Sequence, residues 1–150
     1  MEHTSLVGMT VDAVAFDVER GKVREFAIAT RAGDPAHVEP AAAAARGGSD
    51  LLATATDVVV AGHHRDQQVF VAKLGMDIRR IVVGSTSSEY LRPLHVGDSV
   101  TGERTVIGDE VRTTASGSPM RLLTLETAYT DLHGNVLVIQ REVLIERGTR

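Results

Sequence analysis

A carboxylate and an imidazole lie three residues apart, at Asp34 and His37, in the Pro- and Gly-containing stretch 31–40. An acid beside a histidine is the commonest equipment for proton transfer near neutral pH. Loops often carry such residues because a rigid scaffold positions them. Gly-Asp-Pro at 33–35 is also an ordinary turn sequence, in which Asp binds its own backbone and Pro sets φ. The spacing alone therefore leaves a proton-transfer site and a plain turn both open.

The neighbouring histidines His63 and His64 are a second candidate cluster. We expect them at the C-terminal end of a helix, where the helix dipole favours cationic side chains. Adjacent helical residues do not share a face, which argues against joint metal ligation. The chain has no Cys, so disulfides, thiolate nucleophiles and Cys-ligated metals are excluded. We expect no metal site.

Composition indicates one globular domain spanning residues 1–150, with 43% hydrophobic and 24% charged residues. The net charge of −4, with both signs mixed along the chain, argues against nucleic acid or an anionic membrane as the main partner. Only 3% of the residues are aromatic, so stacking platforms for bases are hard to build. No apolar run approaches the ~20 residues of a membrane helix, and no signal-peptide pattern opens the chain. We expect a cytoplasmic protein.

The first half of the chain alternates between strand and helix patterns. Residues 14–18 have a period of two, and the segment from Glu19 has apolar residues at helical spacing until Gly33, which we expect to close that helix. Pro40 followed by five alanines predicts a short helix that Arg46 and two glycines end. In the stretch 49–68, local propensity favours a strand at 58–60, and a helix over 57–64 is the alternative.

The second half predicts four strands, over 85–92, 100–107, 120–130 and 136–147, and a hairpin joins the last two. Helices early and hairpin strands late indicate an α+β fold. Such a sheet needs a helix across one face. An unpaired sheet edge is normally covered, so we also expect a two-fold dimer.

Three segments in register resemble MaoC-like dehydratase domains of the hot-dog fold: FDVERGKVREF at 16–26, YLRPLHVGDSVTG at 90–102 and LETAYTDLHGN at 125–135. The resemblance covers residues 11–148, and its nearest kin are single-hot-dog proteins, among them the substrate-binding subunit of a bacterial fatty-acid-elongation dehydratase. It implies an antiparallel sheet wrapped around a central helix, and this is why we choose the helix at 57–64.

Proteins of this family hold an acyl thioester, on coenzyme A or acyl carrier protein, in a tunnel between two hot dogs. Active members interconvert (3R)-hydroxyacyl and trans-2-enoyl thioesters through a Gly-Asp-x-Asn-Pro-x-His motif followed by an acid and Pro. The resemblance therefore implies an acyl thioester substrate, no metal or redox cofactor, and a homodimer or a heterodimer with another hot-dog subunit.

The matching segment here is GDPAHVEP at 33–40, in which His37 keeps its offset from Glu39-Pro40. Asp34 matches the family's Asp in type, but two intervening residues, which span up to ~7 Å, are missing. A second departure is LATATD at 52–57, where the family has Ala-Pro-Pro-Thr-Phe. The resemblance implies that substrate-binding positions fall at Gly33, Thr54, Ala55 and Thr56.

Asp57 occupies the expected start of the central helix. One interpretation is a plain helix cap, worth ~0.5–2 kcal/mol. Our sharper hypothesis is that Asp57 and His37 face one cavity and that Asp57 compensates for the shortened loop.

Three functions remain open. The leading one is a hydratase or dehydratase in which His37 is the base or acid, assisted by Asp34 or Asp57. The second is a non-catalytic acyl-binding subunit whose partner supplies the catalytic pair. The third is a repurposed hot-dog enzyme that catalyses a cyclisation or another elimination in a biosynthetic pathway.

Overall fold

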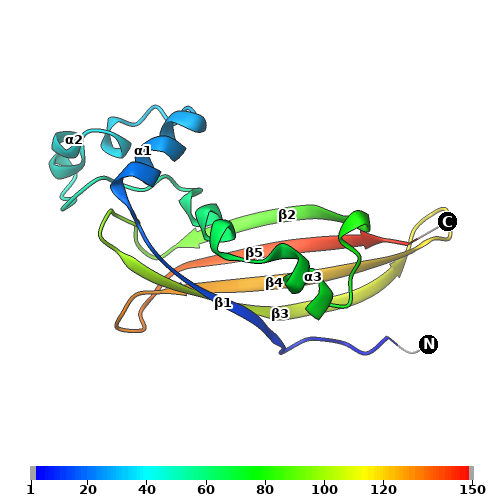
Figure 1. Ribbon diagram of the computed structural model, residues 1–150. Coiled ribbons are helices and arrows are strands. Elements are labelled where there is room, and N and C mark those ends of the chain that lie inside the picture. The colour runs from blue at the N-terminus through cyan, green and yellow to red at the C-terminus, as the bar shows by residue number, and fades with distance from the viewer. Residues whose placement is uncertain (1–2, 149–150) are drawn as a thin grey trace.

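A five-stranded antiparallel sheet forms the body of the molecule in the computed structural model, which describes residues 3–148 (Figure 1). Its strands lie in the order β1-β3-β4-β5-β2. Their bounds are Thr10–Asp17 for β1, Ile81–Tyr90 for β2, Ser99–Thr113 for β3, Pro119–Thr130 for β4 and Val136–Arg147 for β5. The α+β prediction is confirmed, and the strand predicted over 136–147 has the observed bounds.

The helices form two groups. The first group, α1 (Arg20–Ala29), η1 (Pro35–His37) and α2 (Pro40–Ala45), gathers beyond one end of the sheet (Figure 1). The second group, η2 (Asp57–His64) and α3 (Gln67–Lys73), lies across one face of the sheet, and the short η3 (Ile78–Arg80) leads into β2. The sheet therefore packs against the central segment η2, as predicted, and against α3.

Alternate residues of the strands point towards these helices and form the core. Near α1, one apolar cluster joins Val58 and Ala61 of η2 to Tyr129 and Val138 of the sheet. A second cluster joins Phe70 of α3 to other strand residues and lies towards the opposite end. Two contiguous apolar clusters thus hold the central helices in place.

The central segment η2 is a 3₁₀ helix of eight residues, followed by a break before α3. Three consecutive valines and a glycine within the sequence DVVVAGHH are poor α-helix formers, because β-branched residues lose side-chain freedom in that conformation. A 3₁₀ helix has three residues per turn, so positions i, i+3 and i+6 share one face. Val58 and Ala61 face the core, whereas His64 on the same face is exposed. Each of the other two faces lines a separate cavity.

Some expectations for the helices were wrong in detail. Arg31, not Gly33, takes the left-handed conformation after α1, with a φ of 54°. The N–H groups of Arg31 and Ala32 donate to the carbonyls of Ile28 and Ala27, and the helix ends at Ala29, before it reaches Gly33. The sequence pattern also did not predict α3, whose N-terminus is capped by Asp66.

The strand β2 forms one edge of the sheet, and residues 83–89 are all exposed. An open edge of this length is normally covered by another chain, so the dimer remains a prediction that this edge supports. No helix in the range 3–148 is long and apolar enough to cross a membrane.

Candidate active site

His37 is buried and is held by a reciprocal backbone clamp. The carbonyl of Ala36 accepts from Leu52 N at 3.0 Å, and the carbonyl of Leu52 accepts from His37 Nδ1 at 2.7 Å. A carbonyl can only accept, so Nδ1 carries the proton and Nε2 of the neutral ring keeps its lone pair. The fold therefore presents His37 as a base through Nε2.

Asp57 is the first residue of η2, and its side chain is only 3% exposed. Its Oδ1 atom is buried without a hydrogen-bond partner among residues 3–148, and the N-terminus of η2 has no side-chain cap within that range. Asp57 is therefore not the plain helix cap of the alternative interpretation. Burial raises the pKa of Asp57, and the nearby His37 opposes that rise. His37 is therefore close enough to affect the pKa of Asp57, and the shared cavity stays a hypothesis.

The residues preceding Asp57 differ in their access to this site. Thr54 is buried, and its Oγ1 has no partner in the described part of the chain. Ala55 and Thr56 are exposed, and the carbonyl of Ala55 accepts from the hydroxyl of Tyr90. Of the three, Thr54 alone offers a buried hydroxyl without a partner.

Tyr90 also belongs to this neighbourhood, although the sequence alone did not show which way it faces. Burial, with Asp57 as the second cause, raises the pKa of Tyr90 to about 12. The alternation of residues along the strand indicated that Tyr90 lies on one of its two faces. Alternation alone does not show which of the two faces is covered.

The carboxylate of Asp34 stabilises the turn in which it lies. Its Oδ1 accepts from Ala36 N at 3.0 Å, and its other oxygen pairs with Arg46. The Ala36 N–H, ahead of Arg46, lowers the pKa of Asp34 below its usual value. Among the described residues, no hydrogen bond joins the Asp34 carboxylate to the His37 ring. Gly33 is exposed, and a Cβ there would meet no atom within 4 Å.

An apolar cleft of about 260 Å³ runs between α1 and η2. Val60 and His63 line it from η2, opposite Phe26 and Ala29 of α1. These two η2 residues follow Asp57 at i+3 and i+6, so all three lie on one face of the 3₁₀ helix. The cleft therefore extends along the helix face that begins at the buried carboxyl group.

The two adjacent histidines diverge, as expected for neighbouring helix positions. His63 lines the α1 cleft, whereas His64 stacks on Phe16 with their ring centroids 6.1 Å apart. They do not form a joint ligand pair.

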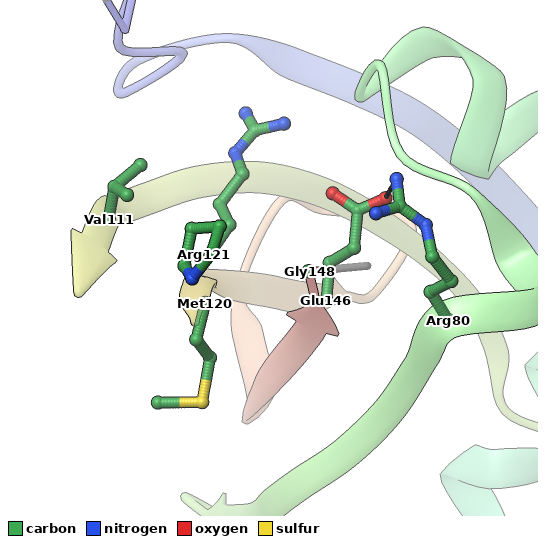
Figure 2. A pocket seen from close by; sticks show the side chains of 7 residues that line it. Arg80, Val111, Met120, Arg121, Glu146 and Gly148 are labelled. Atoms are coloured by element: carbon green, nitrogen blue, oxygen red, sulfur yellow. Dashed lines mark hydrogen bonds and ion pairs between the residues drawn. The ribbon is translucent and has the colours of Figure 1, made fainter. Parts of the chain in front are cut away.

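Another cavity, of about 180 Å³, lies at the opposite end of the sheet (Figure 2). Figure 2 shows Glu146 facing Arg80, to which it is paired at 2.8 Å. Arg121, also in this cavity, is paired with Asp109. The charged groups here already have partners, so we assign no chemistry to this cavity.

The chain combines an antiparallel sheet packed against a central helix with a buried histidine, His37, and a buried acid, Asp57, at the start of that helix. This combination is typical of the dehydratase-like class of hot-dog proteins. Residues 5–140 match the family model described as "FAS1-like, dehydratase domain region". The chain belongs to this family.

Similar proteins agree with that assignment. A "UPF0336 protein" of Clavibacter michiganensis is 35% identical over 148 residues, which cover 97% of this chain and 96% of the relative. A chain of the Mycobacterium tuberculosis HadBC (3R-hydroxyacyl-ACP dehydratase) complex has a TM-score of 0.76 at 24% identity, covering 95% of this chain and 98% of that one. The (R)-hydratase from A. caviae has a TM-score of 0.64 at 21% identity, with 95% and 98% covered. These structural matches confirm the predicted hot-dog fold.

Proposed function

We propose that this protein catalyses the reversible hydration of a trans-2-enoyl thioester to a (3R)-hydroxyacyl thioester. The observation that carries the proposal is the pairing of two complementary groups at one site. His37 has a free Nε2, and Asp57 is a buried acid without a hydrogen-bond partner for Oδ1 in the range 3–148. Groups whose environments suit them to opposite proton-transfer roles are the usual mark of acid–base catalysis.

In the dehydration direction, Nε2 of His37 removes the proton from C2 of the hydroxyacyl thioester. Burial raises the pKa of Asp57, which favours its protonated form. Protonated Asp57 gives its proton to the C3 hydroxyl group, which leaves as water. The proton on the imidazolium then returns to the Asp57 carboxylate, which restores both groups. Hydration is the same sequence in reverse.

Thr54 is the side-chain donor that we assign to the thioester carbonyl. Its buried hydroxyl has no competing partner among residues 3–148, so it is free to stabilise the negative charge that develops on this oxygen. The thioester itself acidifies C2, and the proposed chemistry therefore needs no metal or redox cofactor. Coenzyme A and acyl carrier protein both remain suitable carriers.

The acyl chain fits the cleft between α1 and η2. The cleft is largely apolar, and its volume of about 260 Å³ is slightly below the roughly 300–1,000 Å³ of most ligand pockets. An acyl chain lying over Val60 and Phe26 would place its thioester end towards Asp57.

A second function is a non-catalytic acyl-binding subunit that works with another hot-dog chain. The open β2 edge favours it, since residues 83–89 are exposed. The HadBC protein is a complex and offers a precedent for paired chains of this fold. The engagement of Asp34 by Arg46 also favours this alternative, because the family's usual acid is then not paired with His37.

The two functions separate in one assay. Purified protein is mixed with a crotonyl thioester, and the loss of enoyl absorbance is followed. The catalytic proposal predicts turnover by the protein alone, a loss of about 10²–10⁴-fold in His37→Gln and Asp57→Asn, and little change in the matched control Asp34→Asn.

Activity that needs an added hot-dog partner, and that survives both His37→Gln and Asp57→Asn, would establish the binding-subunit function instead. Thioester binding without turnover under either condition would favour a repurposed reaction. Light scattering at micromolar concentration tests the expected dimer in the same preparations.

A further inference from the structure

Arg65 is a buried arginine that the proposed reaction does not use. It follows η2 directly, and only 6% of its side chain is exposed. With Val59 and Gly62, it lines the third face of the 3₁₀ helix, which borders a cavity of about 140 Å³. Its Nε and Nη2 atoms are both buried without a hydrogen-bond partner among residues 3–148.

Nε and Nη2 form one edge of the guanidinium group, with two parallel N–H donors that match the two oxygens of a carboxylate. In five other arginines of this chain, that edge is filled by a single acidic side chain. This holds for Arg20, Arg79, Arg104, Arg112 and Arg121. Arg65 keeps the same edge buried and empty, although a buried unpaired donor costs about 1–3 kcal/mol.

The nearest acid on the sheet does not fill this edge. Asp12 binds Arg104 through both oxygens, with Nε at 2.9 Å, and it approaches only Nη1 of Arg65, at 3.6 Å. Two buried guanidinium groups therefore share one carboxylate. Burial, followed by the charge of Arg104, lowers the pKa of Arg65.

The other walls of the cavity can assist a ligand. Gln140 and Tyr129 line it, and Gln140 Oε1 accepts from the Tyr129 hydroxyl at 3.1 Å, which leaves the Gln140 amide nitrogen as a donor. Glu142 also lines the cavity, and its carboxylate makes no hydrogen bond within the described residues. Its charge would repel an anion at Arg65 unless it served as the missing partner itself.

We propose that the Nε/Nη2 edge of Arg65 binds the carboxylate or phosphate group of a small-molecule ligand. The cavity has room for about four or five waters at ~30 Å³ each, which suits one such group. The site is separate from the proposed active site, because eight residues of 3₁₀ helix at ~2.0 Å each place Arg65 roughly 16 Å from Asp57.

Thermal unfolding of the full chain in phosphate, in acetate and in chloride at equal ionic strength tests this site. The proposal predicts that phosphate or acetate raises Tm along a saturating curve, as for a ligand that binds only the folded state. Arg65→Lys keeps the charge but loses the two-donor edge, and the apparent Kd should rise at least about tenfold. Arg112→Lys, an exposed arginine paired with Glu110, is the matched control and should leave the curve unchanged.

Glu142→Gln provides a test that does not alter Arg65. Loss of the repelling charge should lower the apparent Kd several-fold, whereas the control Glu110→Gln should not change it. If Glu142→Gln instead destabilises the protein and abolishes the response, Glu142 is the internal partner of Arg65 and the proposal is overturned.

Two further results would also overturn it. One is a Tm that responds equally to chloride. The other concerns the Arg65 Nε–H NMR signal, which should move on adding acetate and stay fixed on protein dilution. A signal that moves on dilution without added anion would show that a second copy of the chain supplies the carboxylate.

Discussion

Replacing Asp57 with Asn should stabilise the protein while it removes the activity. The side chain of Asp57 is 3% exposed and its Oδ1 has no partner among residues 3–148, so ionisation places an uncompensated charge in the interior. Burial raises the pKa of Asp57 above its ordinary value of 3.8. The group therefore favours folding most below pH 3.8, and that contribution is lost as the pH rises through the folded-state pKa.

The size of the effect follows from the cost of an unpaired buried group, about 1–3 kcal/mol and more when it is charged. Asn keeps a polar amide in the same place, and His37 already offsets part of the charge. We therefore expect a gain of about 1–2 kcal/mol in the free energy of unfolding above pH 7. In a chain of this length, ~1 kcal/mol moves Tm by about 2–4 °C, so the rise is about 2–8 °C.

Urea denaturation of both proteins at pH 4 and pH 8 measures this gain. The difference should be small at pH 4 and larger at pH 8, and the variant should lose enoyl hydration by about 10²–10⁴-fold. A variant whose stability equals that of the parent at both pH values and that turns over normally would contradict the placement of Asp57 in a shielded site with His37.

Three other substitutions test the surrounding structure. Asp34→Asn should leave both turnover and the free energy of unfolding nearly unchanged, because Asn caps a helix as well as Asp and the pair lost with Arg46 is exposed; the hydration assay and urea denaturation measure the two. Gly102→Ala should lower the free energy of unfolding by about 1–3 kcal/mol, because the added Cβ would lie 2.6 Å from the Tyr129 ring. In Gly33→Ala the added Cβ would have no atom within 4 Å, so this variant should change neither Tm nor KM. Tyr90→Phe should lower the free energy of unfolding by about 0.5–1.5 kcal/mol through the loss of one hydrogen bond, and an unchanged Tm would refute that contact.

The sequence predicted the sheet better than the central helices. Alternating apolar residues over 120–130 and 136–147 determine which side of each strand is buried, and the observed strands follow them. For 57–64, local propensity favoured a strand, and the family resemblance gave the helix. The segment is a 3₁₀ helix, in which Val58 and Ala61 pack in the core against the sheet.

What the sequence could not predict depends on contacts between distant segments. The clamp between His37 and Leu52 joins residues 15 apart, and it fixes the histidine tautomer without any sequence motif. The Nε/Nη2 edge of Arg65 is likewise left empty because Asp12 binds Arg104 instead. Neither relation has a periodicity or a spacing from which it could be predicted.

The shortened loop itself explains why the acid beside His37 should come from another segment. With only two residues between them, Asp34 and His37 lie at opposite ends of a single turn, in which the Asp34 carbonyl accepts from His37 N and the Asp34 carboxylate accepts from Ala36 N. A carboxylate committed to this turn supports the backbone under the histidine. The clamp on Leu52 draws the segment 52–57 towards His37, and the next acid along that segment is Asp57. Against the larger effect of burial, the nearby His37 lowers the pKa of Asp57. On this argument, lengthening the loop by two residues in an Asp57→Asn background should restore measurable hydration only if the inserted residues release Asp34 from Ala36, which a crystal structure of the insertion variant would show.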